Sequence, residues 1–362
     1  MNPGSPPPVP ELKWLAWEVT RKCNLRCVHC RSDLGHPGDR EFTTEEGKAF
    51  LAGLAAWCHP VVVLSGGEPL LRPDLFALAR HGSSLGLKMA MATNGVLVTE
   101  ACCREILDSG IKMVSLSLDG ATAATHDEFR GQPGAFDGTL RAMERFRRHG
   151  IPFLINSSFT RRNKAEIPAV LDLARQSGAK AWYLFIIVPT GEAEAVKARD
   201  ELISPDEAEE ILRWHFFRER EEKELLMRPI CAPQYFRIAQ EEAKKLGETY
   251  QRRHLSFGTG LNRGCLAGQA ILFVDALGEV HPCSYLSPSA GNARTGSLQE
   301  IWGTSPLLAS LRDVDGYGGK CGACSYRNAC GGCRARAFCD TGDVLGPAPD
   351  CPYLPNLPKG AT

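Results

Sequence analysis

Short apolar runs alternate with longer amphipathic segments through the first half of the chain. The runs are rich in β-branched residues and occupy residues 15–20, 61–66, 88–94, 113–119, 153–159 and 182–188. Strands that are apolar at nearly every position are typical of a parallel sheet whose faces are covered by helices. The pattern therefore predicts six parallel strands.

The intervening segments have the apolar spacing of helices. They occupy residues 43–57, 72–86, 99–110, 138–150 and 166–178, and several begin at Thr or Asp and end at Gly, as helix-capping preferences require. Because strand and helix alternate, we predict an α/β fold over residues 13–200, a partial TIM-like barrel of six βα units. A closed barrel of this type has about eight units.

The rest of the chain has a different character. Residues 201–258 are predicted to form a charged helical bridge, and residues 1–12 a disordered Pro-rich tail. Residues 259–362 are rich in Cys and Gly, with a β-hairpin predicted over residues 270–285. This last segment has too few apolar residues for an ordinary core, so we expect an inorganic group to support it.

Composition argues against several classes of function. The formal net charge is zero and the pI is about 7.1, so nothing favours binding to nucleic acid or to an anionic membrane. No run of about 18 apolar residues occurs, and we expect neither a signal peptide nor a membrane span. Fifteen cysteines, an odd number, predict a reducing cytoplasm in which thiolates bind metal.

Three cysteines follow the first predicted strand in a C-x3-C-x2-C pattern, Cys23, Cys27 and Cys30. The loop is too tight for disulfides, and Arg31 stands where a haem-attachment motif needs His. An iron–sulfur cubane takes four thiolate ligands, so three cysteines leave one iron able to bind a small chelating ligand.

The loop after the second predicted strand reads "SGGEPL". Gly66 and Gly67 allow the backbone to approach a ligand closely, and Glu68 can accept a hydrogen bond from an ammonium group. The carboxyl ends of parallel strands meet at one edge, so both loops belong to one site. A cysteine triplet followed by Gly-Gly-Glu-Pro resembles the radical S-adenosylmethionine (SAM) enzymes.

The resemblance implies a cofactor and its ligands. Cys23, Cys27 and Cys30 would hold a [4Fe–4S] cluster whose open iron binds S-adenosylmethionine, and reductive cleavage would release a 5′-deoxyadenosyl radical. The residues expected to contact S-adenosylmethionine are His29, Gly66, Gly67, Glu68, Asn94, Ser117 and Asp119. For Asn94 and Asp119, a role as turn residues is the alternative.

A second group of cysteines lies near the end of the chain. It reads C-x12-G-x4-C, then C-x2-C-x5-C-x2-C, then a distant Cys351. Paired zinc knuckles are usually about 15 to 20 residues apart, whereas five residues separate Cys324 from Cys330. The pattern resembles the SPASM/twitch-type extension of radical SAM enzymes, which holds one or two auxiliary [4Fe–4S] clusters, although many members have three residues where two separate Cys330 from Cys333.

This second resemblance implies a partition of the ligands. One cluster would be held by Cys321, Cys324, Cys330 and Cys351, and another by Cys265, Cys283 and Cys333. The latter lacks a fourth protein ligand. Cys231, the substrate or an open iron could each complete it.

Longer stretches, including "LSGGEPLLRPDLF", "CAPQYFRI" and "NRGCLAGQAILFVDALGEVHPCSYL", are similar to the haem-synthesising branch of this family. The resemblance implies an oxidoreductase that converts two propionates of iron-coproporphyrin III to vinyl groups, giving haem b. Each propionate would lose a hydrogen atom, carbon dioxide and one electron, and an auxiliary cluster could accept that electron. A flavodoxin or ferredoxin would supply the low-potential electron for cleavage.

Porphyrin carboxylates call for arginine anchors, and the candidates are Arg130, Arg161, Arg237, Arg263, Arg334 and Arg336. Three other functions stay open: a maturase of a ribosomal peptide, a maturase of another cofactor such as a tungsten cofactor, and an inactive barrel with a zinc-binding module. Peptide maturases often carry an N-terminal leader-binding domain, whereas this chain is expected to enter the barrel after a short tail.

Overall fold

The computed structural model describes residues 9–32 and 40–355. The greater part of the predicted tail, residues 1–8, lies outside this range. One sheet of ten strands organises the described residues, in the order β10-β9-β8-β1-β2-β3-β4-β5-β6-β7. The strands are β1 (Trp14–Glu18), β2 (Val61–Ser65), β3 (Lys88–Thr93), β4 (Met113–Ser117), β5 (Phe153–Phe159), β6 (Ala181–Ile186), β7 (Leu226–Ile230), β8 (Ile271–Val274), β9 (Glu279–His281) and β10 (Gly291–Asn292).

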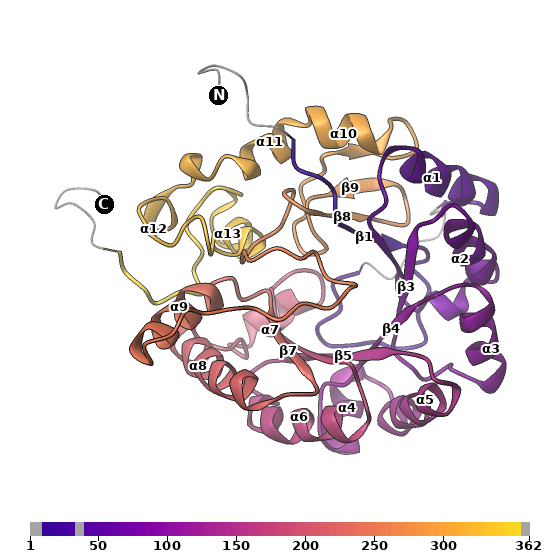
Figure 1. Ribbon diagram of the computed structural model, residues 1–362, viewed down its shortest axis with the longest axis horizontal. Helices are drawn as coiled ribbons and strands as arrows, with labels where there is room; N and C mark the ends of the chain where they lie inside the picture. Colours follow the sequence, from indigo (N-terminus) through magenta and orange to yellow (C-terminus); the bar gives the residue numbers. More distant parts are fainter. Residues whose placement is uncertain (1–8, 33–39, 356–362) are drawn as a thin grey trace.

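The strands from β1 to β7 are all parallel, and β8 runs parallel to β1 on the other side. In Figure 1 they form an arc with the helices on its convex side. The helices are α1 (Thr44–Trp57), α2 (Leu75–Ser84), α3 (Glu100–Asp108), α4 (Ala123–Arg130), α5 (Ala135–His149), α6 (Ile167–Gln176), α7 (Ala193–Ala198), α8 (Pro205–Glu221), α9 (Tyr235–Lys245), α10 (Leu298–Thr304), α11 (Pro306–Arg312), α12 (Gly319–Gly322) and α13 (Arg334–Thr341).

The six predicted strands are present, and β7 extends the arc beside β6. Strand β7 lies in the segment predicted to be a helical bridge, between α8 and α9. Arg228 and Pro229 interrupt its apolar run, which hides the strand in the sequence. Pro229 is tolerated because β7 is at the edge of the sheet, where a missing N–H breaks no ladder.

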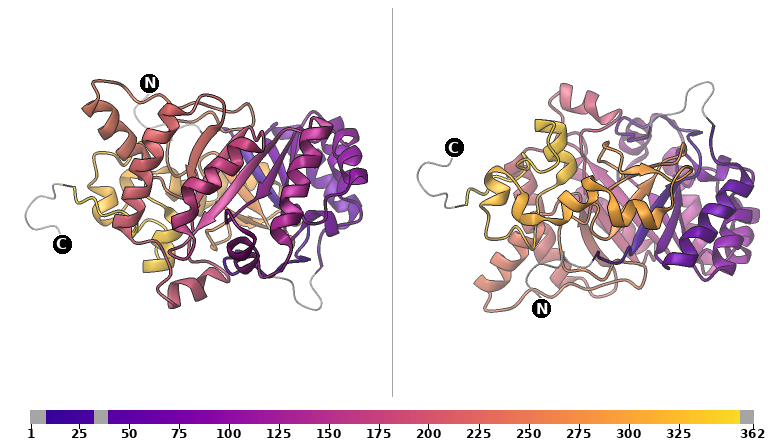
Figure 2. Two further views of the ribbon diagram at one scale, coloured as in Figure 1. Left: turned by 90° about the horizontal axis from the view of Figure 1, so that it is seen from below. Right: turned by 90° about the horizontal axis from the view of Figure 1, so that it is seen from above.

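The Cys-rich segment is joined to the same sheet. The predicted hairpin is confirmed as β8 and β9, which pair antiparallel, and β8 continues the arc beside β1. In Figure 2 the last part of the segment, in yellow, lies on the side of the molecule opposite α2 and α3. Because both later segments contribute strands to one sheet, the domain boundaries at residues 200 and 258 stay a prediction.

The two faces of the sheet are packed differently. Between sheet and helices lies a large apolar core that includes Trp17, Phe146 and Trp182. The inner face is lined by smaller side chains, with Ala16 beside Val63 and Val63 beside Ala90 in register. Small inward-facing residues leave the lumen of the arc incompletely filled, which creates room for a ligand.

Capping follows the sequence rules. Thr43 accepts a hydrogen bond from the backbone N–H of Glu46 at the start of α1, and Thr99 does the same for Cys102 at the start of α3. Gly150 ends α5 in the left-handed region. None of the helices in the described ranges is long and apolar enough to cross a membrane.

Candidate active site

The loop after β1 is fastened to the loop after β2. The backbone N–H of Gly67 donates to the carbonyl of Thr20 at 2.8 Å, and the N–H of Glu68 donates to the carbonyl of Lys22 at 2.8 Å. A Cβ on Gly66 would lie 2.3 Å from the carbonyl oxygen of Thr20, and one on Gly67 equally close to that of Lys22. These glycines therefore make room for the cysteine loop itself, a use that the sequence did not reveal.

The three thiols of this loop interact with one another. Burial raises the pKa of Cys23 to about 11, and the neighbouring Cys27, Glu68 and Cys30 raise it further, although the N–H of Leu25 donates to its sulfur at 3.4 Å. Burial likewise raises the pKa of Cys30. Such thiols become thiolates when a cationic centre binds them. The donor set fits a cluster of iron ions.

Glu68 is fully buried and holds two strand ends together. Its carboxylate accepts from the N–H of Leu70 at 3.1 Å, from the hydroxyl of Thr93 at 2.8 Å and from the N–H of Asn94 at 2.8 Å. Burial raises its pKa to about 7 against these donors. A carboxylate has about four acceptor positions, so the chain itself fills most of them and leaves one for an ammonium group.

Asn94 and Ser117 lie at the ends of the next two strands. The side-chain amide of Asn94 donates to Asn24 Oδ1 at 2.8 Å, and its oxygen accepts from the N–H of Val96 at 3.0 Å. Asn94 thus positions the cysteine loop, since Asn24 follows Cys23 directly. Ser117 is half-buried at the end of β4, in register with Asn156 of β5.

Arg130, the last residue of α4, holds the cysteine loop together with Asp119, which lies between β4 and α4. Asp119 Oδ2 lies 2.5 Å from Arg130 Nη2, and Arg130 Nη1 donates to the sulfur of Cys27 at 3.7 Å. Burial lowers the pKa of Arg130, but Asp119 and Cys27 outweigh burial and raise it above the usual value. The sequence predicts a contact of Asp119 with S-adenosylmethionine and names Arg130 as a candidate anchor for the porphyrin. The structure pairs the two with each other, beneath the cysteine loop.

His29 packs between α4 and the same carboxylate. Its ring centroid lies 4.6 Å from that of Phe129, and its Nε2 lies 3.9 Å from Asp119 Oδ2. Burial and then Arg130 keep the pKa of His29 well below its usual value, so the imidazole is neutral. The N–H of the preceding Val28 donates to the carbonyl of Phe129 at 3.0 Å.

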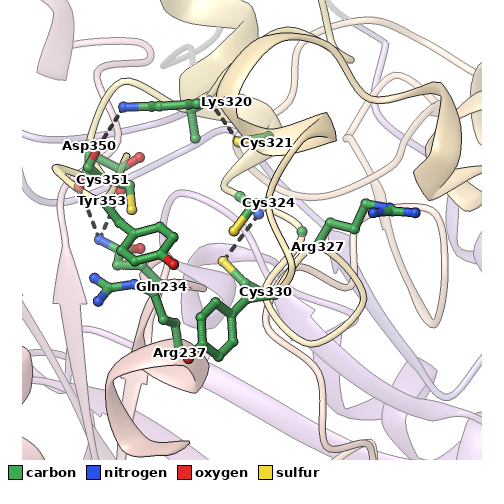
Figure 3. Close-up of a pocket in the computed structure, with 14 residues that line it drawn as sticks. Gln234, Arg237, Lys320, Cys321, Cys324, Arg327, Cys330, Asp350, Cys351 and Tyr353 are labelled. Atoms are coloured by element: carbon green, nitrogen blue, oxygen red, sulfur yellow. Dashed lines mark hydrogen bonds between the residues drawn. The ribbon is translucent and has the colours of Figure 1, made fainter. Parts of the chain in front are cut away.

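A second group of sulfurs gathers in the C-terminal segment. Figure 3 shows the side chains that line one small cavity there, with the sulfurs of Cys321, Cys324, Cys330 and Cys351 among them. Backbone N–H groups of Ala348 and Gly332 donate to the sulfurs of Cys321 and Cys330, at 3.3 Å and 3.4 Å. A Cβ on Gly332 would lie 2.8 Å from the Cys321 sulfur. The structure thus brings together the four cysteines that the sequence grouped.

Cations surround this cavity. Lys320 and Arg237 line it, and Lys320 Nζ donates to the carbonyl of Cys351 at 2.5 Å. A [4Fe–4S] cluster with four thiolates is an anion, and N–H groups and cations near its sulfurs stabilise it. The charge and the donors both suit such a cluster.

A third group of sulfurs lies in the wall of a larger cavity. Its lining includes Cys265, Cys283 and Cys333, the incomplete set from the sequence, together with Cys231. Cys231 and Cys283 pack against the apolar cluster that contains the buried Cys333. Cys231 directly follows β7, Cys265 is in the loop before β8, Cys283 follows β9, and Cys333 directly precedes α13.

No group of three or more His, Cys, Asp or Glu side chains within residues 9–32 and 40–355 is arranged to hold a single metal ion. The ligands of a cubane surround a body of eight atoms, so they stand further apart than the ligands of one ion.

The larger cavity has a volume of about 370 Å³ and occupies the lumen of the arc, a size typical of small-molecule sites. Inward-facing residues of the strands, such as Ala16, Val63 and Ala90, form an apolar wall. Four arginines line it within the described part of the chain, namely Arg31, Arg228, Arg252 and Arg263.

Two of these arginines have unused donors. The Nε and Nη2 of Arg263 and the Nε of Arg228 are buried without a hydrogen-bond partner among the described residues. Burial, together with repulsion by the Arg228 cation, lowers the pKa of Arg252 to about 10. Arg31 lies 4.2 Å above the ring of Phe273. Buried cations with free N–H groups indicate an anionic ligand.

Of the arginines predicted to anchor carboxylates, Arg263 lines this cavity and the others are bound elsewhere. Arg161 forms a surface pair with Asp200 and Glu207, and Arg237 pairs with Glu209 and Glu241. Arg334 and Arg336 are buried and donate to backbone carbonyls, those of Gly346 and of Ile186 among them. The sequence missed Arg31, Arg228 and Arg252. Of these three, only Arg31 could have been suspected from the sequence, because it directly follows the predicted cluster ligand Cys30.

Comparison with known proteins agrees with this arrangement. Residues 17–190 match the model of the Radical SAM superfamily, and residues 265–334 match SPASM, an iron–sulfur cluster-binding domain. The structure also superposes on SuiB of Streptococcus suis bound to S-adenosylmethionine, with a TM-score of 0.73 at 18% identity, over 95% of this chain and 78% of SuiB. The likeness to SuiB shows a shared fold.

Relatives of higher identity extend over nearly the whole chain. The AdoMet-dependent heme synthase of Methanosarcina barkeri is 42% identical over 343 residues, 94% of this chain and 96% of the relative. The AdoMet-dependent heme synthase of Nitratidesulfovibrio vulgaris is 39% identical over 347 residues, 96% of this chain and 94% of the relative. The chain therefore belongs to the radical SAM enzymes with a SPASM domain, in the family of the AdoMet-dependent heme synthases.

Proposed function

We propose that the chain is a radical SAM decarboxylase that converts two propionates of iron-coproporphyrin III to vinyl groups, giving haem b. The observation that carries the proposal is the lumen cavity, which combines an apolar wall with arginines whose donors are unused. Its relatives named AdoMet-dependent heme synthase support the same reaction.

The cavity matches the chemistry of a coproporphyrin. The macrocycle is flat and apolar, and its propionates are carboxylates at the periphery. Ala16, Val63 and Ala90 present a smooth apolar surface, while an arginine guanidinium binds a carboxylate through two parallel hydrogen bonds. We assign the propionate contacts to Arg31, Arg228, Arg252 and Arg263.

The cavity also lies between the two chemical centres. Arg31 belongs to its lining and directly follows Cys30 of the first cysteine loop. Cys231, Cys265, Cys283 and Cys333 belong to the lining as well. A ligand in the lumen would therefore touch segments that carry both sets of thiols. This is the placement that radical generation and electron removal require.

When bound, the clusters and S-adenosylmethionine supply a 5′-deoxyadenosyl radical and an electron acceptor. Each propionate loses a hydrogen atom, carbon dioxide and one electron as it becomes a vinyl group. The residues of the chain have supporting tasks. The arginines hold the carboxylates in place, and the apolar wall excludes water from a reactive radical.

We assign Cys23, Cys27 and Cys30 to the SAM-binding cluster, and Cys321, Cys324, Cys330 and Cys351 to one auxiliary cluster. The remaining position of Glu68 would accept from the ammonium group of S-adenosylmethionine. His29, Asn94, Ser117 and Asp119 belong to the surroundings of this site, where Asn94 and Asp119 position the cysteine loop. An external flavodoxin or ferredoxin would supply the electron, and the free thiols suit a reducing cytoplasm.

The test is incubation of anaerobically reconstituted protein with iron-coproporphyrin III, S-adenosylmethionine and a low-potential reductant. Mass spectrometry should find 5′-deoxyadenosine and a porphyrin lighter by two carbon dioxide molecules and four hydrogen atoms, formed through a monovinyl intermediate. An unchanged porphyrin beside accumulating 5′-deoxyadenosine would show that the substrate is another molecule. Absence of 5′-deoxyadenosine would refute the radical chemistry itself.

A further inference from the structure

The cysteine set in the wall of the lumen has three members that follow the SPASM spacing, Cys265, Cys283 and Cys333. We propose that Cys231 is the fourth thiolate ligand of the cluster at this set, so that all of its irons are held by the protein. Cys231 lines the same cavity as the other three, and it packs with Cys283 against the apolar cluster that contains Cys333. The assignment needs neither the porphyrin nor S-adenosylmethionine.

The backbone of Cys231 is held in an unusual conformation. Its φ is +56°, and Asp200 is the other non-glycine residue in the described ranges with a positive φ. This left-handed region is disfavoured for residues with a Cβ, and Gly adopts it without strain. A cysteine that adopts this strained conformation therefore indicates that its thiol has a function at this position.

Arg336 fixes the position of Cys231. Its Nη1 donates to the carbonyl of Cys231 at 2.6 Å, and its Nη2 donates to the carbonyls of Ile186 and Ile187 at 2.7 Å and 2.8 Å. Arg336 belongs to α13, and Cys333 is the residue that precedes this helix. One helix thus places Cys333 directly and Cys231 through its carbonyl, which fixes the two thiols relative to each other.

The four thiols share one wall of the cavity, where Cys333 is buried and the other three are half-buried. They can all be thiolates only if a centre of several cations lies among them.

The lining of the cavity contributed by the described residues offers no better iron ligand than Cys231. No His, Asp or Glu side chain is part of the lining contributed by the described residues, and its further polar side chains include Ser284 and Tyr285. Serine hydroxyls and tyrosine phenols are neutral near pH 7. Thiolates are also the preferred ligands of iron–sulfur clusters, which leaves Cys231 as the ligand.

The assignment has a consequence for the reaction. With four protein thiolates the cluster has no open iron, so a porphyrin carboxylate in the cavity contacts arginine and never iron. The cluster then accepts an electron across the wall of the cavity without binding the substrate.

The experiment removes the other three-cysteine site first, with Cys23→Ala, Cys27→Ala and Cys30→Ala in the full chain. In this background we compare Cys231→Gly with the parent. Gly suits the left-handed backbone, so the variant removes the thiol without adding strain. Cys339→Ala is the matched control, because Cys339 is in α13 and packs in the same apolar cluster as Cys333.

Each reconstituted protein is measured for iron and sulfide and by electron paramagnetic resonance after mild ferricyanide oxidation. The parent should hold about eight irons, from two cubanes, and show no [3Fe–4S] signal. Cys231→Gly should either lose about four irons or form a [3Fe–4S] cluster, because a cubane with three ligands readily loses its fourth iron. Cys339→Ala should match the parent.

Two results would overturn the assignment: a [3Fe–4S] signal in the parent equal to that of Cys231→Gly, or parental iron content and spectrum in Cys231→Gly. If Cys231→Gly fails to fold, Cys231→Ser decides, since an oxygen ligand should retain the iron and change the spectrum of the reduced cluster. An unchanged spectrum with Ser would equally refute the ligand. Porphyrin turnover plays no part in these readouts, so the proposed function can stand or fall separately.

Discussion

Asp119 Oδ2 lies 2.5 Å from Arg130 Nη2 beneath the first cysteine loop, and both side chains are buried. Arg130 also donates to Cys27, and its backbone carbonyl accepts from the N–H of Arg26 at 3.3 Å. The pair therefore joins the end of β4 and α4 to the loop that would hold the SAM-binding cluster.

Replacing Arg130 by Gln should destabilise this loop strongly. Loss of one partner of a buried ion pair costs about 3 to 5 kcal/mol because the other charge stays uncompensated. Urea unfolding should show this loss, and iron bound by the first cysteine loop should fall. Arg161→Gln is the control, because its pairs are at the surface and such pairs are worth about 0 to 1 kcal/mol. Equal stability of the two variants would contradict the assigned role of Arg130.

The arginines of the lumen should control porphyrin affinity. A hydrogen bond to a charged group is worth about 1.5 to 3 kcal/mol, so Arg252→Gln or Arg263→Gln should weaken binding of iron-coproporphyrin III by about 10- to 100-fold. Absorption titrations measure the dissociation constant, with Arg161→Gln as control. Cleavage of S-adenosylmethionine without porphyrin should stay unchanged. Unaltered porphyrin affinity in both variants would place the substrate elsewhere.

Filling the lumen should block the substrate and spare the cofactor. Ala90 faces the cavity from β3, and Ala90→Leu adds three carbons to its wall. We expect porphyrin turnover to fall at least about tenfold. Without porphyrin, the variant should still form 5′-deoxyadenosine. Ala56→Leu, on the exposed side of α1, is the matched control. Full turnover by Ala90→Leu would exclude the lumen as the porphyrin site.

The auxiliary cluster at the second cysteine group should be needed for decarboxylation. Cys324 lines that small cavity, and Cys324→Ala leaves three of its thiols. We expect loss of porphyrin product with continued formation of 5′-deoxyadenosine, measured side by side by chromatography, because the cluster in the wall of the lumen cavity then cannot pass on the electron that it accepts from the substrate radical. Cys339→Ala should behave as the parent. Normal porphyrin turnover in Cys324→Ala would exclude this cluster from the electron path.

Stability should fall in acid in part through His215. Burial lowers the pKa of this imidazole to about 3, and its ring stacks at 6.4 Å on Trp182. The folded state keeps His215 neutral while the unfolded state takes up a proton below about pH 6.5, so the unfolding free energy falls with pH below that value. From pH 7.5 to about pH 5 the loss from this group is about 2 kcal/mol. Urea unfolding at the two pH values should show that the unfolding free energy of His215→Phe falls by about 2 kcal/mol less than that of the parent. An equal fall in both proteins would refute this role of His215.

Much of the fold and of the cysteine grouping is predictable from sequence, for physical reasons. Buried parallel strands need continuous apolar runs, and six of them are visible, whereas Arg228 and Pro229 hide β7. Cys324 and three other cysteines could be grouped by their resemblance to the SPASM pattern, namely Cys321, Cys330 and Cys351. Cys231 could not be placed, since its proximity to Cys333 depends on the hydrogen bonds of Arg336 to β6 and to Cys231 itself.

The site residues were harder to interpret because sequence reveals residue type but not partner. The contact of Gly66 and Gly67 with S-adenosylmethionine stays a prediction, and the structure adds that both glycines lie against the backbone of the cysteine loop. Arg130 was expected to bind a carboxylate of the substrate, and it binds that of Asp119. The arginines of the lumen come from a loop, a strand and an irregular segment, so no periodicity connects them.

The most direct test of the proposed reaction uses iron-coproporphyrin III deuterated at the propionate carbons next to the macrocycle. We expect deuterium to appear in 5′-deoxyadenosine as the divinyl product forms, because the radical removes a hydrogen atom from that carbon. Unlabelled 5′-deoxyadenosine together with an unchanged porphyrin would contradict the proposed reaction.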